Sequence, residues 1–225
     1  MTCKICNHKL EHFSNAFFDR SSSDKTEVGY FKCGNCELIC APEFDDWSSD
    51  DWATKVYTVD YNINVDDGCV NRQHRTANKI KDVKFNFHLD FGCGNGLLSQ
   101  ILMLKHGKQS YFYDPFNRRE GDFDLPECSA KVVFDLVTAV EVFEHLVDPN
   151  LIFDQINPVT SKGTRLMTNT KLSSTFNGAF RDFWYVNPRA GHISFYTKKT
   201  LEILASKHGW QLTHSNGGSH DFIKL

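Results

Sequence analysis

Short apolar runs alternate with segments of helical periodicity over the last two thirds of the chain. The apolar runs predict strands at residues 85–91, 110–114, 134–142, 163–170, 210–215 and 221–225. The run at 134–142 is continuously apolar, as expected of a strand with both sheet faces covered. Strands that alternate with helices predict a doubly wound α/β domain with a mostly parallel sheet.

Two of the predicted helices have clear start or stop signals. The helix over residues 97–106 has leucine and isoleucine at helical spacing and ends before Gly107. A second helix follows Asp148, which we expect to be its N-cap, with Pro149 at the first helical position. This helix should stop at Pro158, because proline cannot continue a helix.

Composition divides the chain into three zones. Residues 1–44 hold five of the eight cysteines, residues 45–82 are acidic at first and then basic, and residues 83–225 carry the α/β pattern. The first zone predicts a small zinc-ribbon module, because so short a segment could hardly bury a core without a metal. The second predicts a connector and a leading helix.

Length and charge narrow the class of protein. The 225 residues suit one α/β domain with a small appendage. The net charge of −3 provides no overall positive field, so a small-molecule partner is favoured over nucleic acid. The N-terminus has no apolar leader, and no apolar run approaches the roughly 18 residues of a membrane span. We therefore expect a cytoplasmic protein without a membrane partner.

Cysteines in a reducing compartment indicate thiols and metal ligands rather than disulfides. Two C-x-x-C pairs would each bring two thiolates onto one tetrahedral zinc ion, and a β-hairpin would absorb the long intervening stretch, residues 7–32. Cys40 and His8 are substitute ligands. Four sulfur ligands leave no open position, so the zinc would be structural. The predicted ligands are Cys3, Cys6, Cys33 and Cys36.

The stretch LDFGCGNG, residues 89–96, begins at the end of the first predicted strand and raises the question of a nucleotide site. Gly92 and Gly94 match the first two glycines of the dinucleotide fingerprint G-x-G-x-x-G, but Leu97 stands where the third is expected. The third glycine, Gly96, comes one position early, and Asp90 precedes the turn. The pattern argues against NAD and therefore against an oxidoreductase.

The pattern D-x-G-x-G-x-G resembles motif I of the class I S-adenosylmethionine-dependent methyltransferases. Residues 134–149, FDLVTAVEVFEHLVDP, resemble the fourth-strand motif of methyltransferases related to the ubiquinone-biosynthesis O-methyltransferases. Residues 191–210 resemble the segment after their fifth strand, and the cysteine-rich start is similar to zinc ribbons that precede some bacterial methyltransferase domains. The resemblance implies a Rossmann-like, seven-stranded sheet and S-adenosylmethionine as cofactor.

The resemblance also assigns cofactor contacts. Glycines let the backbone pass close beneath the methionine and ribose portions, Asp90 suits an ammonium group, and Asp114 can accept both ribose hydroxyls. The third strand, expected around residues 119–133, is poorly marked, so Asp122 and Phe123 are weak candidates for the adenine pocket. The predicted cofactor-binding residues are Asp90, Gly92, Cys93, Gly94, Gly96, Asp114, Pro115 and Glu141.

Candidate catalytic residues follow the fourth predicted strand. Glu141 ends the strand, and Glu144 and His145 share its face if the segment turns helically. The cofactor carries the activated methyl group, so the protein mainly orients the acceptor, and His145 could take the proton of an acceptor hydroxyl. Alternatively, Glu141 only shapes the cofactor pocket and Glu144 only orients His145.

The segment Glu-x-x-Glu-His also resembles the divalent-metal ligands of some ubiquinone O-methyltransferases and of small-RNA 3′-terminal 2′-O-methyltransferases. His192 could supply the further histidine, completing a catalytic set of Glu144, His145 and His192 beside Glu141. Two carboxylates and two imidazoles suit Mn²⁺, Fe²⁺ or Zn²⁺. The aromatic stretch at residues 174–192 is either a lid over the substrate or an insertion that packs its own core.

The sequence therefore predicts methyl transfer from S-adenosylmethionine to a hydroxyl of a small molecule, such as a sugar, a nucleotide-sugar or a phenol-like compound. One alternative is a metal-dependent RNA 3′-end 2′-O-methyltransferase. Another is a non-catalytic interaction module, against which the intact set of motif residues counts.

Overall fold

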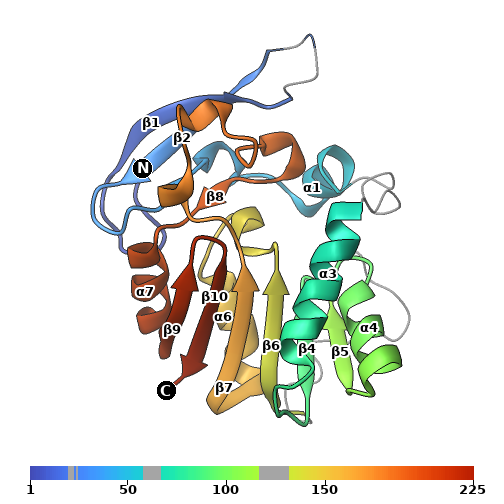
Figure 1. Ribbon diagram of the computed structural model, residues 1–225. Helices are drawn as coiled ribbons and strands as arrows, with labels where there is room; N and C mark the ends of the chain where they lie inside the picture. Colours follow the sequence, from blue (N-terminus) through green and yellow to red (C-terminus); the bar gives the residue numbers. More distant parts are fainter. Residues whose placement is uncertain (20–22, 24, 58–66, 117–131) are drawn as a thin grey trace.

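Two sheets make up the fold, with a smaller sheet above the carboxyl ends of the parallel strands of a central sheet (Figure 1). This computed structural model describes residues 1–19, 23, 25–57, 67–116 and 132–225. The N-terminus lies in the smaller sheet, and the C-terminus lies at the far end of the central sheet. No helix in these ranges is long and apolar enough to cross a membrane.

The described part of the central sheet has six strands in the order β5-β4-β6-β7-β10-β9. The first four are parallel, and β10 is antiparallel to both of its neighbours. Each strand coincides with a predicted apolar run, whereas the seventh expected strand falls mostly on residues 117–131, outside the described residues. The bounds are β4 (His88–Phe91), β5 (Ser110–Tyr113), β6 (Phe134–Val140), β7 (Thr160–Asn169), β9 (Trp210–Asn216) and β10 (Ser219–Lys224).

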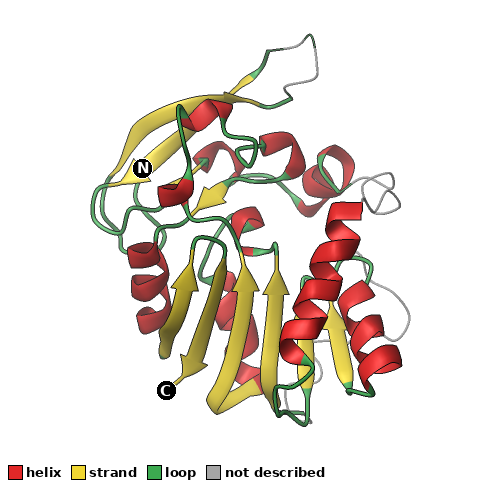
Figure 2. Cartoon of the chain, viewed as in Figure 1, coloured by secondary structure: helices red, strands yellow, loops and turns green. Residues whose placement is uncertain are grey.

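Helices cover both faces of the central sheet, as the predicted doubly wound fold requires (Figure 2). On one face, α3 and α4 share an apolar core with Leu136 and Val140 of β6. On the other face, α6 and α7 share a core with Val137 and Leu166. The predicted leading helix is α3, and the connector adds α1. The bounds are α1 (Ser49–Lys55), α3 (Asp67–Ile80), α4 (Leu97–His106), α6 (Leu151–Ile156) and α7 (Lys198–Lys207).

Helix α6 begins later than its sequence signals predict. Asn150, not Asp148, occupies the N-cap position. The Asp148 carboxylate instead accepts hydrogen bonds from the backbone amide of Asn150 at 3.0 Å and from its side-chain amide at 2.7 Å. An aspartate that bonds the backbone two residues onward favours a turn over a helix start. Asp148 and Pro149 therefore form a turn before the helix.

The smaller sheet has the strand order β1-β2-β3-β8. β1 and β2 form the predicted antiparallel hairpin, from the pair Leu10 and Cys33 to the pair Phe17 and Glu27. The fourth strand was not predicted, because β8 comes from the far end of the sequence and pairs with β3. The N-terminal zone is thus joined to the rest of the chain by strand pairing. The bounds are β1 (Leu10–Phe17), β2 (Glu27–Cys33), β3 (Ile39–Cys40) and β8 (Ser194–Phe195).

The aromatic stretch at residues 174–192 packs against the smaller sheet and so does not form a core of its own, while its role as a lid over the substrate stays a prediction. Phe180 contacts Tyr30 of β2 and Phe195 of β8, with ring centroids 5.1 and 5.4 Å apart. Phe176 also contacts Phe195, at 5.6 Å. These rings fill a core shared with the smaller sheet, because each alone would leave an apolar face exposed.

Candidate functional site

A cavity of about 440 Å³ lies at the carboxyl ends of β4, β5 and β6. This is where open α/β sheets bind their ligands. Trp52 and Tyr57 line its outer wall, from the connector before α3. The predicted site residues that line it are Gly92, Gly94, Asp114, Pro115, Glu141 and His145. Cys93 and Gly96, in the same turn, are not among the lining residues.

The glycine turn needs glycine for two reasons. Gly92, Gly94 and Gly96 have φ angles of 67°, 56° and 73°, in the left-handed region that other residues rarely adopt. A Cβ atom on Gly92 would also lie 2.5 Å from a methyl carbon of Val142, which is closer than real Cβ contacts. The amides of Gly92 and Cys93 donate to the carbonyl of Tyr113, which ties the turn to the end of β5. The backbone therefore passes close to the cavity without a side chain in the way.

Asp114 lies at the cavity with both carboxylate oxygens already oriented. One oxygen accepts the amide of Gly94 at 2.9 Å, and the other accepts the amide of Phe116 at 2.9 Å. Each carboxylate oxygen can accept a second hydrogen bond. Asp114 thus fits the predicted role of accepting two hydroxyl groups of a ribose.

Asp90 does not line the cavity, although it was predicted to meet an ammonium group of the cofactor. Its side chain lies beneath the glycine turn, with 2% of its surface exposed. The carboxyl oxygens lie 3.3 Å from the hydroxyl of Ser99 and 3.0 Å from that of Thr138. Burial raises the pKa of Asp90 to about 7. The geometry therefore gives Asp90 a place inside the fold and no direct access to a ligand.

Asp90 is one of five side chains that form a closed ring of hydrogen bonds. From Ser99 the ring continues to Ser110 at 2.8 Å and on to His88 at 2.7 Å. His88 then reaches Thr138 at 2.9 Å, and Thr138 returns to Asp90. Burial lowers the pKa of His88 to about 3, so its ring is neutral at pH 7. The ring joins β4, β5, β6 and α4 directly under the cavity.

Glu141 occupies an unusual backbone conformation at the cavity wall. Its φ of 56° is left-handed, which is rare for a residue with a side chain and recurs at functional sites. Burial and the nearby Glu144 raise the pKa of Glu141 to about 7. Arg72 of α3 lies 4.0 Å from the Glu141 carboxylate. A cation thus lies beside this acid, although Arg72 is not among the residues that line the cavity.

Glu144, His145 and His192 come together as predicted. Each offers one ligand atom, and the three atoms lie within 4.8 Å of one another. Glu141, the fourth predicted member, is not in this group. Glu144 is fully buried in the short 3₁₀ turn Phe143–His145. Glu144 Oε2 and His145 Nδ1 are buried without a hydrogen-bond partner, which is costly unless a ligand satisfies them.

Protonation states of the cluster suit a metal ion. Burial lowers the pKa of His145 and of His192, so both imidazoles are neutral at pH 7. A neutral imidazole is the form that ligates metals. Two imidazoles and a buried carboxylate fit Mn²⁺, Fe²⁺ or Zn²⁺. The same neutral imidazoles could alternatively accept a proton.

The four predicted cysteine ligands also form one group. The Sγ atoms of Cys3 and Cys36 lie 3.4 Å apart, as do those of Cys6 and Cys33, and all four lie within 4.8 Å of one another. Tetrahedral zinc with Zn–S bonds of about 2.3 Å requires sulfur–sulfur distances near ~3.8 Å, so the group fits zinc. The hydrogen bond from Cys36 lowers the pKa of Cys3 to about 5. The substitute candidates, Cys40 and His8, lie outside the group.

Two contacts of the site were missed by the sequence analysis. Arg72 of α3 lies 4.0 Å from the Glu141 carboxylate. Tyr185 binds Glu144 through its hydroxyl, a contact that the aromatic pattern of residues 174–192 did not indicate. Neither contact follows from a motif, and only the fold brings these residues here. Asp122 and Phe123, the adenine-pocket candidates, lie outside the described residues.

Comparison with known proteins places the chain among methyltransferase folds. A family model described as "Methyltransferase domain" matches residues 61–215. No curated protein matches the sequence.

Solved structures resemble this chain at low identity. The mitomycin 7-O-methyltransferase is 11% identical, with a TM-score of 0.56 over 73% of this chain and 56% of that one. An O-methyltransferase family protein from Burkholderia thailandensis is 12% identical, with a TM-score of 0.54 over 72% and 57% of the two chains. The O-methyltransferase NcsB1 from neocarzinostatin biosynthesis is 9% identical, with a TM-score of 0.51 over 68% and 57%. This chain thus spans little more than half the length of these proteins, and the likeness shows the fold alone.

Proposed function

Since this chain belongs to the methyltransferase-domain family and is therefore a methyltransferase, we propose that it transfers a methyl group from S-adenosylmethionine to a hydroxyl oxygen of a small molecule. One observation carries the proposal. The cluster of Glu144, His145 and His192 borders, through His145, the cavity that the glycine turn forms. A proton-accepting or metal-binding group thus lies beside the place expected for the cofactor.

Residues of the cavity wall match the parts of S-adenosylmethionine. Asp114 would accept the ribose hydroxyls, and Gly92 and Gly94 leave room beneath them. Glu141 lines the cavity and would accept a hydrogen bond from the ammonium group of the methionine portion, and Arg72, 4.0 Å from Glu141, is a nearby cation for the carboxylate of that portion. When bound, the cofactor supplies a methyl group activated by the positive sulfur.

The acceptor hydroxyl must lose its proton during transfer. An imidazole whose pKa is lowered by burial is a weak base by itself, which favours a metal-assisted reaction over simple base catalysis. We propose that Glu144, His145 and His192 hold a divalent ion, which would lower the pKa of the acceptor hydroxyl. The two buried atoms without partners support this assignment.

Small molecules remain the favoured acceptors. The net charge of −3 offers no general attraction for RNA. The similar structures include a mitomycin 7-O-methyltransferase and an O-methyltransferase in complex with 1,4-dihydroxy-2-naphthoic acid. An RNA 3′ end is the second candidate, favoured only by the resemblance of the Glu144–His145–His192 set to metal-dependent 2′-O-methyltransferases. A structural zinc at the four cysteines and a cytoplasmic location complete the proposal.

Calorimetry with S-adenosylhomocysteine tests the cofactor assignment. Asp114→Ala should weaken binding by roughly 2–3 kcal/mol, because the lost hydrogen bonds have a charged acceptor. The exposed Asp82 offers a matched control, and Asp82→Ala should leave the affinity unchanged. No binding to the wild-type protein, or equal binding by the Asp114→Ala variant, would contradict the proposed site.

A further inference from the structure

Tyr185 binds two members of the cluster through two different groups. Its phenol hydroxyl donates to Glu144 Oε1 at 2.5 Å. Its backbone carbonyl accepts a hydrogen bond from His192 Nδ1 at 2.7 Å. Glu144 comes from the 3₁₀ turn after β6 and His192 from the segment before β8, so a single residue joins two distant parts of the chain.

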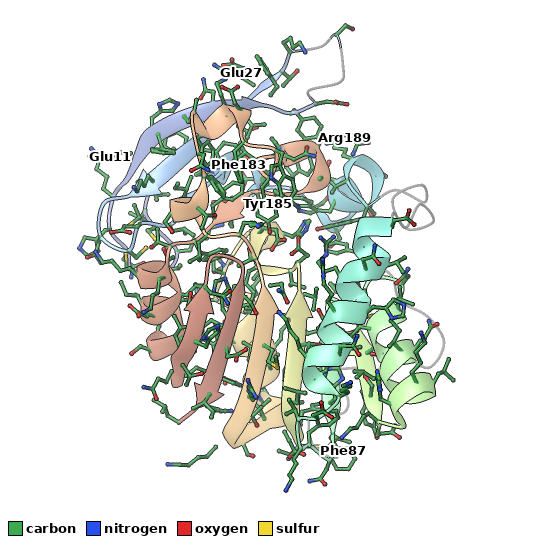
Figure 3. All side chains as sticks on the ribbon, viewed as in Figure 1. Glu11, Glu27, Phe87, Phe183, Tyr185 and Arg189 are labelled. Atoms are coloured by element: carbon green, nitrogen blue, oxygen red, sulfur yellow. The ribbon has the colours of Figure 1, made fainter. Side chains whose placement is uncertain are left out.

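Tyr185 is itself rigidly placed. The side chain is 1% exposed, and it lies where the smaller sheet meets the central one (Figure 3). Its ring contacts His192 at a centroid distance of 4.4 Å and Phe195 at 6.2 Å. Its hydroxyl oxygen also lies 3.3 Å from the backbone amide of Lys171, at the end of β7. The phenol therefore has little freedom to move away from Glu144.

The two contacts decide which atoms of the cluster remain available. With Oε1 bound to the phenol, Glu144 keeps Oε2, which is buried without a partner. With Nδ1 bound to a carbonyl, His192 carries its proton there and keeps Nε2 as a lone-pair donor. Hydrogen bonds of this kind fix the tautomer and orientation of metal ligands.

We propose that Tyr185 is a positioning residue, which orients Glu144 and His192 so that both can bind a divalent ion beside the acceptor hydroxyl. The inference rests on the proposed function, because it requires an ion at the cluster. It adds a role for the phenol that the motif residues do not supply: Tyr185 touches neither the ion nor the acceptor and acts only through its two neighbours.

The test compares Tyr185→Phe with a matched variant. Tyr196→Phe also removes a buried hydroxyl, which donates to the carbonyl of Phe143 at 2.8 Å and does not touch the side chains of the cluster. Mn²⁺ affinity is measured by calorimetry and by the electron paramagnetic resonance of free Mn²⁺, on protein whose cysteine site is first loaded with zinc. Tyr185→Phe should weaken Mn²⁺ binding by roughly 10- to 100-fold, the usual effect of losing such a neighbour. Tyr196→Phe should change it less than about threefold, since the ligands keep their partners.

A double variant keeps the test decisive if Tyr185→Phe lowers overall stability. In a Glu144→Gln background, adding Tyr185→Phe should weaken Mn²⁺ binding further by a much smaller factor, because the phenol then has no carboxylate to orient. Equal Mn²⁺ affinity of wild type and Tyr185→Phe would overturn the inference alone. Absence of Mn²⁺ binding to the wild type would overturn the metal assignment with it, while binding of S-adenosylhomocysteine would still support the methyltransferase site.

Discussion

The hydroxyl of Tyr30, in β2 of the smaller sheet, donates a 2.8 Å hydrogen bond to the backbone carbonyl of His192. The next residue, Ile193, accepts the amide of Ala41 at 3.0 Å, and β8 then pairs with β3. The smaller sheet therefore holds the backbone of a predicted catalytic residue in place. Substitutions in the smaller sheet should therefore affect the position of His192 through this hydrogen bond and the pairing of β3 with β8.

Tyr30→Phe tests that connection. The variant loses one buried hydrogen bond and leaves the His192 carbonyl without its donor, so the free energy of unfolding should fall by about 1–2 kcal/mol. Methyl transfer should slow, because His192 is less well held, while affinity for S-adenosylhomocysteine stays the same. Urea unfolding and calorimetry measure the two effects. An unchanged turnover number at lower stability would show that the bond is only structural.

Removal of the proposed zinc should affect more than the hairpin. Cys3 and Cys36 belong to the same apolar core as Leu201 and Trp210, so disorder around the ribbon would expose part of the central core. We expect one zinc per chain by elemental analysis, and a Cys3→Ser/Cys36→Ser variant without zinc and with a melting temperature lower by several degrees. Native protein without zinc would refute this assignment.

Asp90 should be protonated more readily than an exposed aspartate. The hydroxyls of Ser99 and Thr138 both donate hydrogen bonds to its carboxyl, but these bonds do not offset the cost of burying a charge. Burial raises the pKa of Asp90 to about 7, against a usual 3.8.

Asp90→Asn should therefore be tolerated, with an effect that depends on pH. Because the pKa of Asp90 is higher in the folded state, its contribution to wild-type stability is full below about pH 4 and is lost as pH rises toward 7. The variant has no such loss, so relative to wild type it should gain up to a few kcal/mol between pH 4 and 8, at about 1.4 kcal/mol per pKa unit. Affinity for S-adenosylhomocysteine should change little. A large loss of affinity for S-adenosylhomocysteine would instead support the predicted direct contact between Asp90 and an ammonium group of the cofactor.

Gly92→Ala should damage both stability and cofactor binding. The new Cβ would meet Val142 at 2.5 Å in a backbone with φ of 67°. Gly107→Ala is a suitable control, because Gly107 has φ of 60° with open space around it and ends α4 away from the cavity. The control should lose only the roughly 1–2 kcal/mol of left-handed strain and keep its affinity for S-adenosylhomocysteine. Equal losses of stability and affinity in Gly92→Ala and Gly107→Ala would mean that the Val142 side chain moves aside at little cost.

The sequence by itself determined the features that depend on neighbouring residues. Apolar runs set the six described strands of the central sheet, because a buried strand must be apolar whatever packs against it. The spacing of Gly92, Gly94 and Gly96 set the left-handed turn, and the two C-x-x-C pairs set the sulfur cluster. Glu144 and His145 are adjacent in the chain, so one local turn brings both to the site.

Only the tertiary structure decided the contacts between distant residues. Tyr185 and Glu144 are 41 positions apart, and no local pattern fixes the 2.5 Å hydrogen bond between them. The pairing of β8 with β3 depends on how the smaller sheet packs above the central one. Asp90 looked like a ligand-binding acid because its motif is local, but its burial depends on β5, β6 and α4 closing around it. Periodicity records which face of an element is buried, whereas the partners that meet there are chosen by packing across the whole chain.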